Sequence, residues 1–222
     1  MIHKSNILSS KMQGVDEETC SQFLKLAHES VRKGIENSSK EFSRDPAQYD
    51  FRTAKAVWMN AQIKKLFQQS LLMSTLRNKV KHLKSHGVDY YLLQGKMLVC
   101  FKKMDKKSRV SGFYSKRFKN SLMGGSVNYS KRMLDNLSKM GIIKPLPIYY
   151  VGHIIDTSGK LIDVRLVNYE NLKVSTLLSL VELFKPNLFS NSSENESDLV
   201  KSKAKEDLVR LKPGIIAEKR KA

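Results

Sequence analysis

The sequence predicts an α+β protein, in which an N-terminal helical layer packs on a small antiparallel sheet built from two hairpins. Three observations support this class. Apolar residues recur at helical spacing in the first third, two pairs of β-rich segments flank short turns further on, and the last segment is polar and turn-rich. We expect a polar leader over 1–14, a single domain over 15–186, and a linker with a flexible tail over 187–222. Within the domain, 15–86 forms the helical layer and 87–186 a hairpin–helix–hairpin–helix portion.

The first predicted helix begins after Asp16, because Glu17 and Glu18 then lie at its positive end. Asn37-Ser38-Ser39 is a turn-forming sequence and predicts the end of this helix, and Asp45-Pro46 predicts a new start. Its apolar stripe consists of Cys20, Phe23, Leu24, Ala27, Val31 and Ile35.

A second helical segment is predicted over 51–86, as one helix or as two that meet at Gln68-Gln69-Ser70. Between residues 51 and 87 it carries eight Lys and Arg and no acid, so pairs of opposite charge cannot stabilise it. We therefore expect a counter-charge from outside the segment. Gly87 predicts its end. Its apolar positions include Ala54, Val57, Trp58, Ala61, Met73, Leu76, Val80 and Leu83.

Two hairpins are predicted in the second half of the chain. The first joins 88–93 to 97–103 through Gln94-Gly95, and the second joins 147–155 to 160–168 through a turn at 156–159. A helix over 128–140, ending at Gly141, connects the hairpins, and an amphipathic helix over 172–184 follows them.

The net charge of +19 is concentrated in the middle of the chain. Residues 51–144 hold 21 Lys and Arg against 3 Asp and Glu, a net +18, whereas 1–50 carry −1 and 145–222 carry +2. A local field of this strength in a globular chain is typical of a protein that faces a polyanion.

Other classes are not supported by the composition. The longest uncharged runs have 11 residues, far fewer than the roughly 20 of a transmembrane helix, and the N-terminus lacks the apolar region of a secretory signal. Cys20 and Cys100 are too few and too far apart for a disulfide framework or a zinc site. We expect a cytoplasmic protein with no membrane partner.

The segment 102–132 carries the clearest functional pattern. Its bases can neutralise phosphates, and the interleaved aromatic residues can stack on unpaired bases. The alternative is a solvated loop whose aromatic side chains pack on the core beneath it. The candidate nucleic-acid-binding residues are Lys102, Lys103, Lys106, Lys107, Arg109, Lys116, Arg117, Lys119, Lys131, Arg132, Phe113 and Tyr114.

Residues 126–168 contain a basic helix with Leu134 and Leu137, then Gly-Ile-Ile and a hairpin. This order resembles the recognition helix and wing of winged-helix DNA-binding domains. The resemblance implies that Ser130, Lys131 and Arg132 would face the major groove. The chain departs from that family because strands, not two helices, are predicted before the segment, and because the wing has only two bases. An ordinary capped amphipathic helix is the alternative.

Few residues suggest catalysis. Asp156, Asp163 and Glu170 lie on or beside the second hairpin, as in metal-dependent nucleases, but the usual acid-x-Lys element is missing. His82 and His86 have a spacing that could hold zinc on a helix, without a third ligand nearby in the sequence. We predict no catalytic residue, no metal site and no cofactor, and Cys100 is expected in the core.

The sequence thus favours a non-enzymatic nucleic-acid-binding protein, for example a regulator, that contacts the phosphate backbone through its basic centre, 51–144. The same charge would also suit an interaction module that binds an acidic protein, such as an inhibitor, an antitoxin or a phage-borne factor. A metal-dependent nuclease is a third hypothesis. DNA and RNA are not distinguished, and neither is the oligomeric state.

Overall fold

The N-terminal helical layer begins with α2 (Glu17–Arg44), whose cap is as predicted. The Asp16 carboxylate accepts a hydrogen bond from the Thr19 backbone N–H at 2.8 Å, and two glutamates occupy the first turn. The predicted end at residues 37–39 is wrong, because α2 continues through them to Arg44. Ser38 is accommodated because its buried hydroxyl donates to the Gly34 carbonyl within the helix, at 2.7 Å.

We describe the fold from a computed structural model, which describes residues 14–47, 51–115, 118, 131–144, 146–170 and 173–185, without the side chains of residues 52 and 176. The described residues up to Phe184 belong to one compact unit. The predicted leader apart from Gly14, and all of the predicted linker and tail at 187–222, lie outside the described residues.

Helix α3 (Arg52–Leu72) packs closely on α2. At their crossing, a Cβ atom added to Gly34 would lie 2.7 Å from Ile63 Cγ1 and 2.9 Å from Ile63 Cα, so glycine permits this approach. The rings of Phe23 and Phe67 meet edge to face at 5.2 Å between their centroids. The two helices therefore form one layer, as predicted.

The second helical segment ends earlier than predicted. After α3 come a short 3₁₀ helix, η1 (Thr75–Asn78), and the strand β1 (Val80–Ser85), so the predicted helix over 80–86 is wrong. The tight turn to the next strand uses His86 and Gly87, whose φ angles are +48° and +77°. The backbone of β1 forms its hydrogen bonds with β2 (Val88–Leu93). His82 and His86, whose spacing could hold zinc on a helix, therefore do not share a helix.

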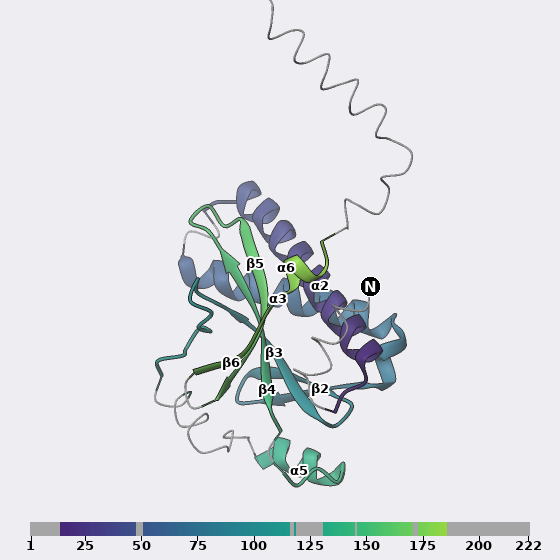
Figure 1. The fold of residues 1–222 in the computed structure, drawn as a ribbon. Helices are drawn as coiled ribbons and strands as arrows, with labels where there is room; N and C mark the ends of the chain where they lie inside the picture. Colours follow the sequence, from purple (N-terminus) through teal and green to yellow (C-terminus); the bar gives the residue numbers. More distant parts are fainter. Residues whose placement is uncertain are drawn as a thin grey trace, which may run out of the picture. The chain divides into compact units, whose positions relative to one another are not determined.

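Six strands form one sheet in the order β1-β2-β3-β4-β5-β6 (Figure 1). Both predicted hairpins are confirmed, and all neighbouring pairs are antiparallel except β3–β4, which is parallel. The predicted helix over 172–184 is wrong, since it is a strand and a single helical turn that starts at a Ser179 cap. The remaining elements are β3 (Met97–Lys103), β4 (Ile148–Ile155), β5 (Leu161–Glu170), β6 (Lys173–Ser179) and α6 (Leu180–Leu183).

The parallel pair requires a crossover, and residues 104–147 provide it. This connection contains α5 (Lys131–Lys139), which lies within the predicted helix over 128–140. The winged-helix interpretation is contradicted here. Strand β4 lies between β3 and β5 and is buried at every position except its last, so the hairpin that follows α5 is a central part of the sheet and not an exposed wing.

Each face of the sheet is covered by its own apolar cluster. One face packs on α2 and α3, with Val99 and Phe101 of β3 among the buried residues. The other face packs on α5 and on the start of the crossover, with Leu98 and Cys100 pointing that way. The alternation along β3 thus separates a helical side from a crossover side. The α+β class is confirmed.

Candidate nucleic-acid interface

The first part of the crossover, residues 104–115, forms an ordered loop, which we call the basic loop. Met104 and Val110 form a β-bridge, and Met104 lies directly over Gly152 of β4, where a Cβ atom would be 2.1 Å from the Met104 Cε. The Asp105 carboxylate accepts from the Arg109 backbone N–H at 2.9 Å and closes the turn between them. The base of the loop is therefore fixed by packing and by its own hydrogen bonds.

Two side chains of β5 hold the basic loop from outside. The Tyr169 hydroxyl donates to the Ser108 carbonyl at 2.5 Å and accepts from the Val110 backbone N–H at 3.1 Å. Arg165 donates to the Lys106 carbonyl at 3.1 Å and to the Ser108 hydroxyl at 2.8 Å. Burial raises the pKa of Tyr169 to about 12, so its hydroxyl remains a donor throughout the neutral range.

Three exposed lysines lie at this place: Lys103 at the end of β3, and Lys106 and Lys107 in the basic loop. None of the three makes an ion pair with another of the described residues. Lys102 is half-buried. Arg109 is paired with Asp105, with a nitrogen–oxygen distance of 2.7 Å, and its charge is therefore partly neutralised. Burial acts to raise the pKa of Asp105, but the hydrogen bonds from Arg109 outweigh it and the pKa is lowered.

The aromatic residues of the loop have different environments. Phe113 is half-buried, with its centroid 5.4 Å from Phe118 and 5.3 Å from Tyr169, so it supports the loop as the alternative interpretation expected. Tyr114 is 63% exposed, and the Arg109 guanidinium lies 5.1 Å from its ring centroid. Of the two predicted aromatic contacts, Tyr114 alone offers an exposed ring.

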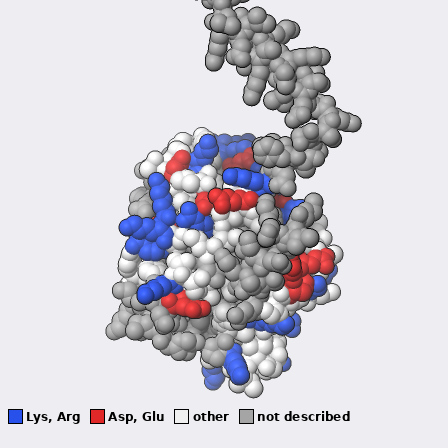
Figure 2. Space-filling view, viewed as in Figure 1, with Lys and Arg blue, Asp and Glu red and all other residues white. Residues whose placement is uncertain are grey.

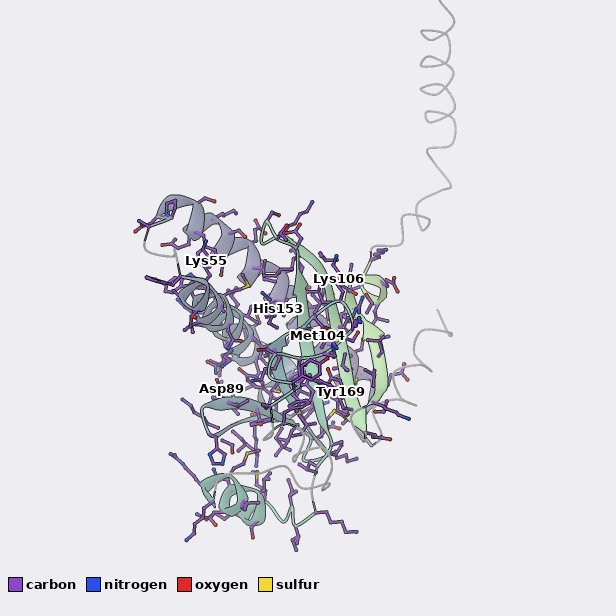
Figure 3. All side chains as sticks on the ribbon, turned by 90° about the vertical axis from the view of Figure 1, so that its left-hand side faces the viewer. Lys55, Asp89, Met104, Lys106, His153 and Tyr169 are labelled. Atoms are coloured by element: carbon purple, nitrogen blue, oxygen red, sulfur yellow. The ribbon has the colours of Figure 1, made fainter. Side chains whose placement is uncertain are left out.

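The predicted bases do not form one group. Lys131 and Arg132 are exposed at the start of α5, which is anchored by buried Met133 and Leu137. This helix lies at the end of the sheet where β4 begins, away from Lys106 (Figures 1 and 3). On the face drawn in Figure 2, acidic and uncharged residues separate the basic side chains. Three predicted residues, Lys116, Arg117 and Lys119, lie outside the described residues.

A second polar group, which sequence reasoning missed, lies between α3 and the first hairpin. Asp89 of β2 accepts from Lys64 of α3 at 2.5 Å and contacts His82 of β1 at 2.9 Å, and its side chain is 15% exposed. Burial acts to raise the pKa of Asp89, but the hydrogen bonds from Lys64 and His82 lower it below its usual value. One sequence signal could have shown that His82 and Asp89 lie close together. If His86-Gly87 is taken as a hairpin turn, the alternation of side chains along the two strands places both residues on the same face.

The acids proposed for metal-dependent catalysis have separate structural roles. Asp156 accepts from the Ser158 hydroxyl at 2.6 Å in its turn, and Asp163 accepts from Arg165 at 2.7 Å. Glu170 is exposed. In the part of the chain that the structure describes, no three His, Cys, Asp or Glu side chains are grouped in a way that could hold a metal ion.

Both cysteines are free and buried, and burial raises the pKa of Cys20 and of Cys100 to about 12, so neither is a reactive thiol. Cys100 lies in the core as predicted. Among the described residues, no helix combines the length and the apolar character needed to cross a bilayer. Comparisons with protein families, with curated proteins and with solved structures found no match to this chain.

Proposed function

We propose that this protein binds nucleic acid in the cytoplasm, as a regulator would, with the basic loop as one contact surface. The observation that carries the proposal is that Lys106 and Lys107 of the fixed basic loop, and Lys103 at the end of β3 beside it, are exposed and have no acidic partner among the described residues. Because the backbone is already ordered, only the lysine side chains lose conformational entropy when they meet a phosphate. The net +18 of residues 51–144 supplies the longer-range attraction.

The chemistry of the surface favours backbone contacts over base readout. Lysines act as point charges toward phosphates and release counterions on binding. Tyr114 is the exposed ring that can stack on an unpaired base. We therefore propose binding that depends steeply on salt, with a preference for single-stranded over fully paired nucleic acid.

The test is a salt series of fluorescence anisotropy with labelled single-stranded and duplex DNA and RNA. One variant carries Lys103→Glu, Lys106→Glu and Lys107→Glu. The matched control reverses three exposed lysines elsewhere, namely Lys25, Lys33 and Lys160. On duplex DNA, each lost phosphate contact reduces the slope of log K against log salt by about 0.9.

The loop variant should lose about three such contacts and the control should lose none. Absence of wild-type affinity at low salt, or equal loss in both variants, would refute the proposal. If the protein instead co-purifies with one acidic protein and this association survives nuclease treatment, the interaction-module hypothesis replaces it.

A further inference from the structure

The group formed by Lys64, His82 and Asp89 is more than a surface ion pair. Its three members come from three elements, and the carboxylate between the Lys64 ammonium and the His82 imidazole is largely shielded from water. Although burial acts to raise the pKa of Asp89, the hydrogen bonds from Lys64 and His82 lower it, so the carboxylate remains ionised and accepts hydrogen bonds in the neutral pH range. Its position apart from Lys106 and Tyr169 is visible in Figure 3.

Two contacts orient the imidazole of His82, a polar one at Nε2 and a stacking one on its ring. Its Nε2 lies 2.9 Å from the Asp89 carboxylate, and its ring stacks on Tyr91 with a centroid distance of 5.3 Å and an angle of 25°. A neutral imidazole that donates from Nε2 to a carboxylate carries its lone pair on Nδ1. The side chain is 41% exposed, so an external group can reach it. A carboxylate that fixes the tautomer of a histidine in this way is the arrangement that prepares a general base.

The surroundings of His82 attract phosphate. Lys84 follows His82 on the same face of β1; it is exposed and makes no ion pair with another of the described residues. The only described acid in the hairpin is Asp89, which Lys64 and His82 already engage. An oriented base is therefore set among cations at the edge of the sheet.

We propose that this group is a site of RNA cleavage by transesterification, with His82 as the general base, Asp89 and Lys64 as positioning residues, and Lys84 as a phosphate contact. His82 Nδ1 takes the proton of a ribose 2′-hydroxyl, and the 2′ oxygen forms a bond to the adjacent phosphorus. The bond from phosphorus to the 5′ oxygen breaks, and that oxygen takes a proton from water. The hydroxide left behind accepts the proton from His82, so the products are a 2′,3′-cyclic phosphate and a 5′-hydroxyl.

This inference rests on the proposed function, because RNA must first bind. The experiment incubates the full chain with a labelled single-stranded RNA in the presence of EDTA, and with the same strand carrying one 2′-deoxyribose at the cleaved position. We expect cleavage of the first strand, protection of the deoxy position, and a 2′,3′-cyclic phosphate end.

Two matched variants test the assignment. His82→Asn should lower the cleavage rate about 100-fold or more, which is the low end of what general base catalysis contributes, while RNA affinity changes less than about 2-fold. His86→Asn, in the exposed turn four residues on, should cleave as the wild type does. Asp89→Asn should lower kcat and leave KM nearly unchanged, because it positions the base without contacting RNA.

RNA that binds but remains intact overturns the inference and leaves the proposed function standing. Equal cleavage by the wild type and by His82→Asn also overturns it, since the activity then comes from elsewhere. If no RNA binds at all, the cleavage inference falls, and the proposed function is then decided by whether the chain binds DNA in the anisotropy series.

Discussion

The hydroxyl of Tyr169 is expected to control the order of the basic loop. Tyr169→Phe removes one oxygen that serves two backbone groups, the Ser108 carbonyl and the Val110 N–H, and both residues are buried. Each group left without a partner costs about 1–3 kcal/mol, and some relaxation of the loop recovers part of this. We therefore expect the free energy of unfolding to fall by about 2–4 kcal/mol. For a chain of this size that lowers Tm by about 5–15 °C.

Urea denaturation followed by circular dichroism measures this loss, and hydrogen exchange localises it. Backbone amides in 104–115 should exchange faster than those of α2, and affinity for nucleic acid should fall with them. Ser108→Ala is the comparison, because it removes one acceptor of the half-exposed Arg165 and leaves the Tyr169 bonds in place; it should cost about 1 kcal/mol or less. A Tyr169→Phe protein with wild-type stability and unchanged exchange in the loop would refute the reasoning.

Three further predictions concern stability, each measured by chemical denaturation. Gly34→Ala gains about 1 kcal/mol of helix propensity, but its Cβ would meet the Ile63 backbone, so a net loss of about 1–2 kcal/mol is expected; a stabilised variant would contradict a tight crossing. Gly152→Ala should lower the free energy of unfolding by about 1–3 kcal/mol, and by less when it is introduced into a Met104→Ala protein. If the losses of the two single variants simply add in the double variant, the two residues are not in contact. Burial and nearby Lys103 lower the pKa of His153 from 6.5 to about 4, so protonation favours the unfolded chain and stability should fall by about 3 kcal/mol as the pH drops through this range. His153→Leu should remove that part of the pH dependence, and an unchanged profile would show that carboxylates account for all of it.

The sequence predicted the class and most of the sheet, because period-2 patterns and turn residues are local signals. The prediction failed where the apolar residues of a segment fitted the spacing of a helix and that of a strand equally well. The apolar residues Leu76, Val80 and Leu83 keep helical spacing, yet Val80 and Leu83 are buried in the strand β1, which pairs with β2, and Leu76 is buried in η1. A similar conflict at 173–179 was decided by β5, whose free edge β6 completes. In both cases the deciding partner is the neighbouring strand of a hairpin, and the apolar spacing within the segment itself does not reveal that pairing.

The site was predictable in composition but not in arrangement. The exposure of Lys103, Lys106 and Lys107 agrees with a charged loop, whereas the burial of Phe113 depends on Tyr169, more than fifty positions later. The His82 and Asp89 pair could not be found while β1 was read as the end of a helix. Charge totals therefore selected the candidate region, and tertiary contacts determine which of its described residues face solvent.

The single parallel junction between β3 and β4 has a consequence for how the molecule assembles. Each half of the sheet is a three-stranded meander with short connections, but the junction between the halves closes only after residues 104–147 have crossed over. Loop closure over that length makes this pairing non-local, so we expect it to form late in folding. Because the basic loop starts at this junction and is held by β5 from the other half, affinity for a polyanion through this loop should arise only when both halves have joined. Binding of a polyanion during refolding would therefore report when the two halves of the sheet have joined.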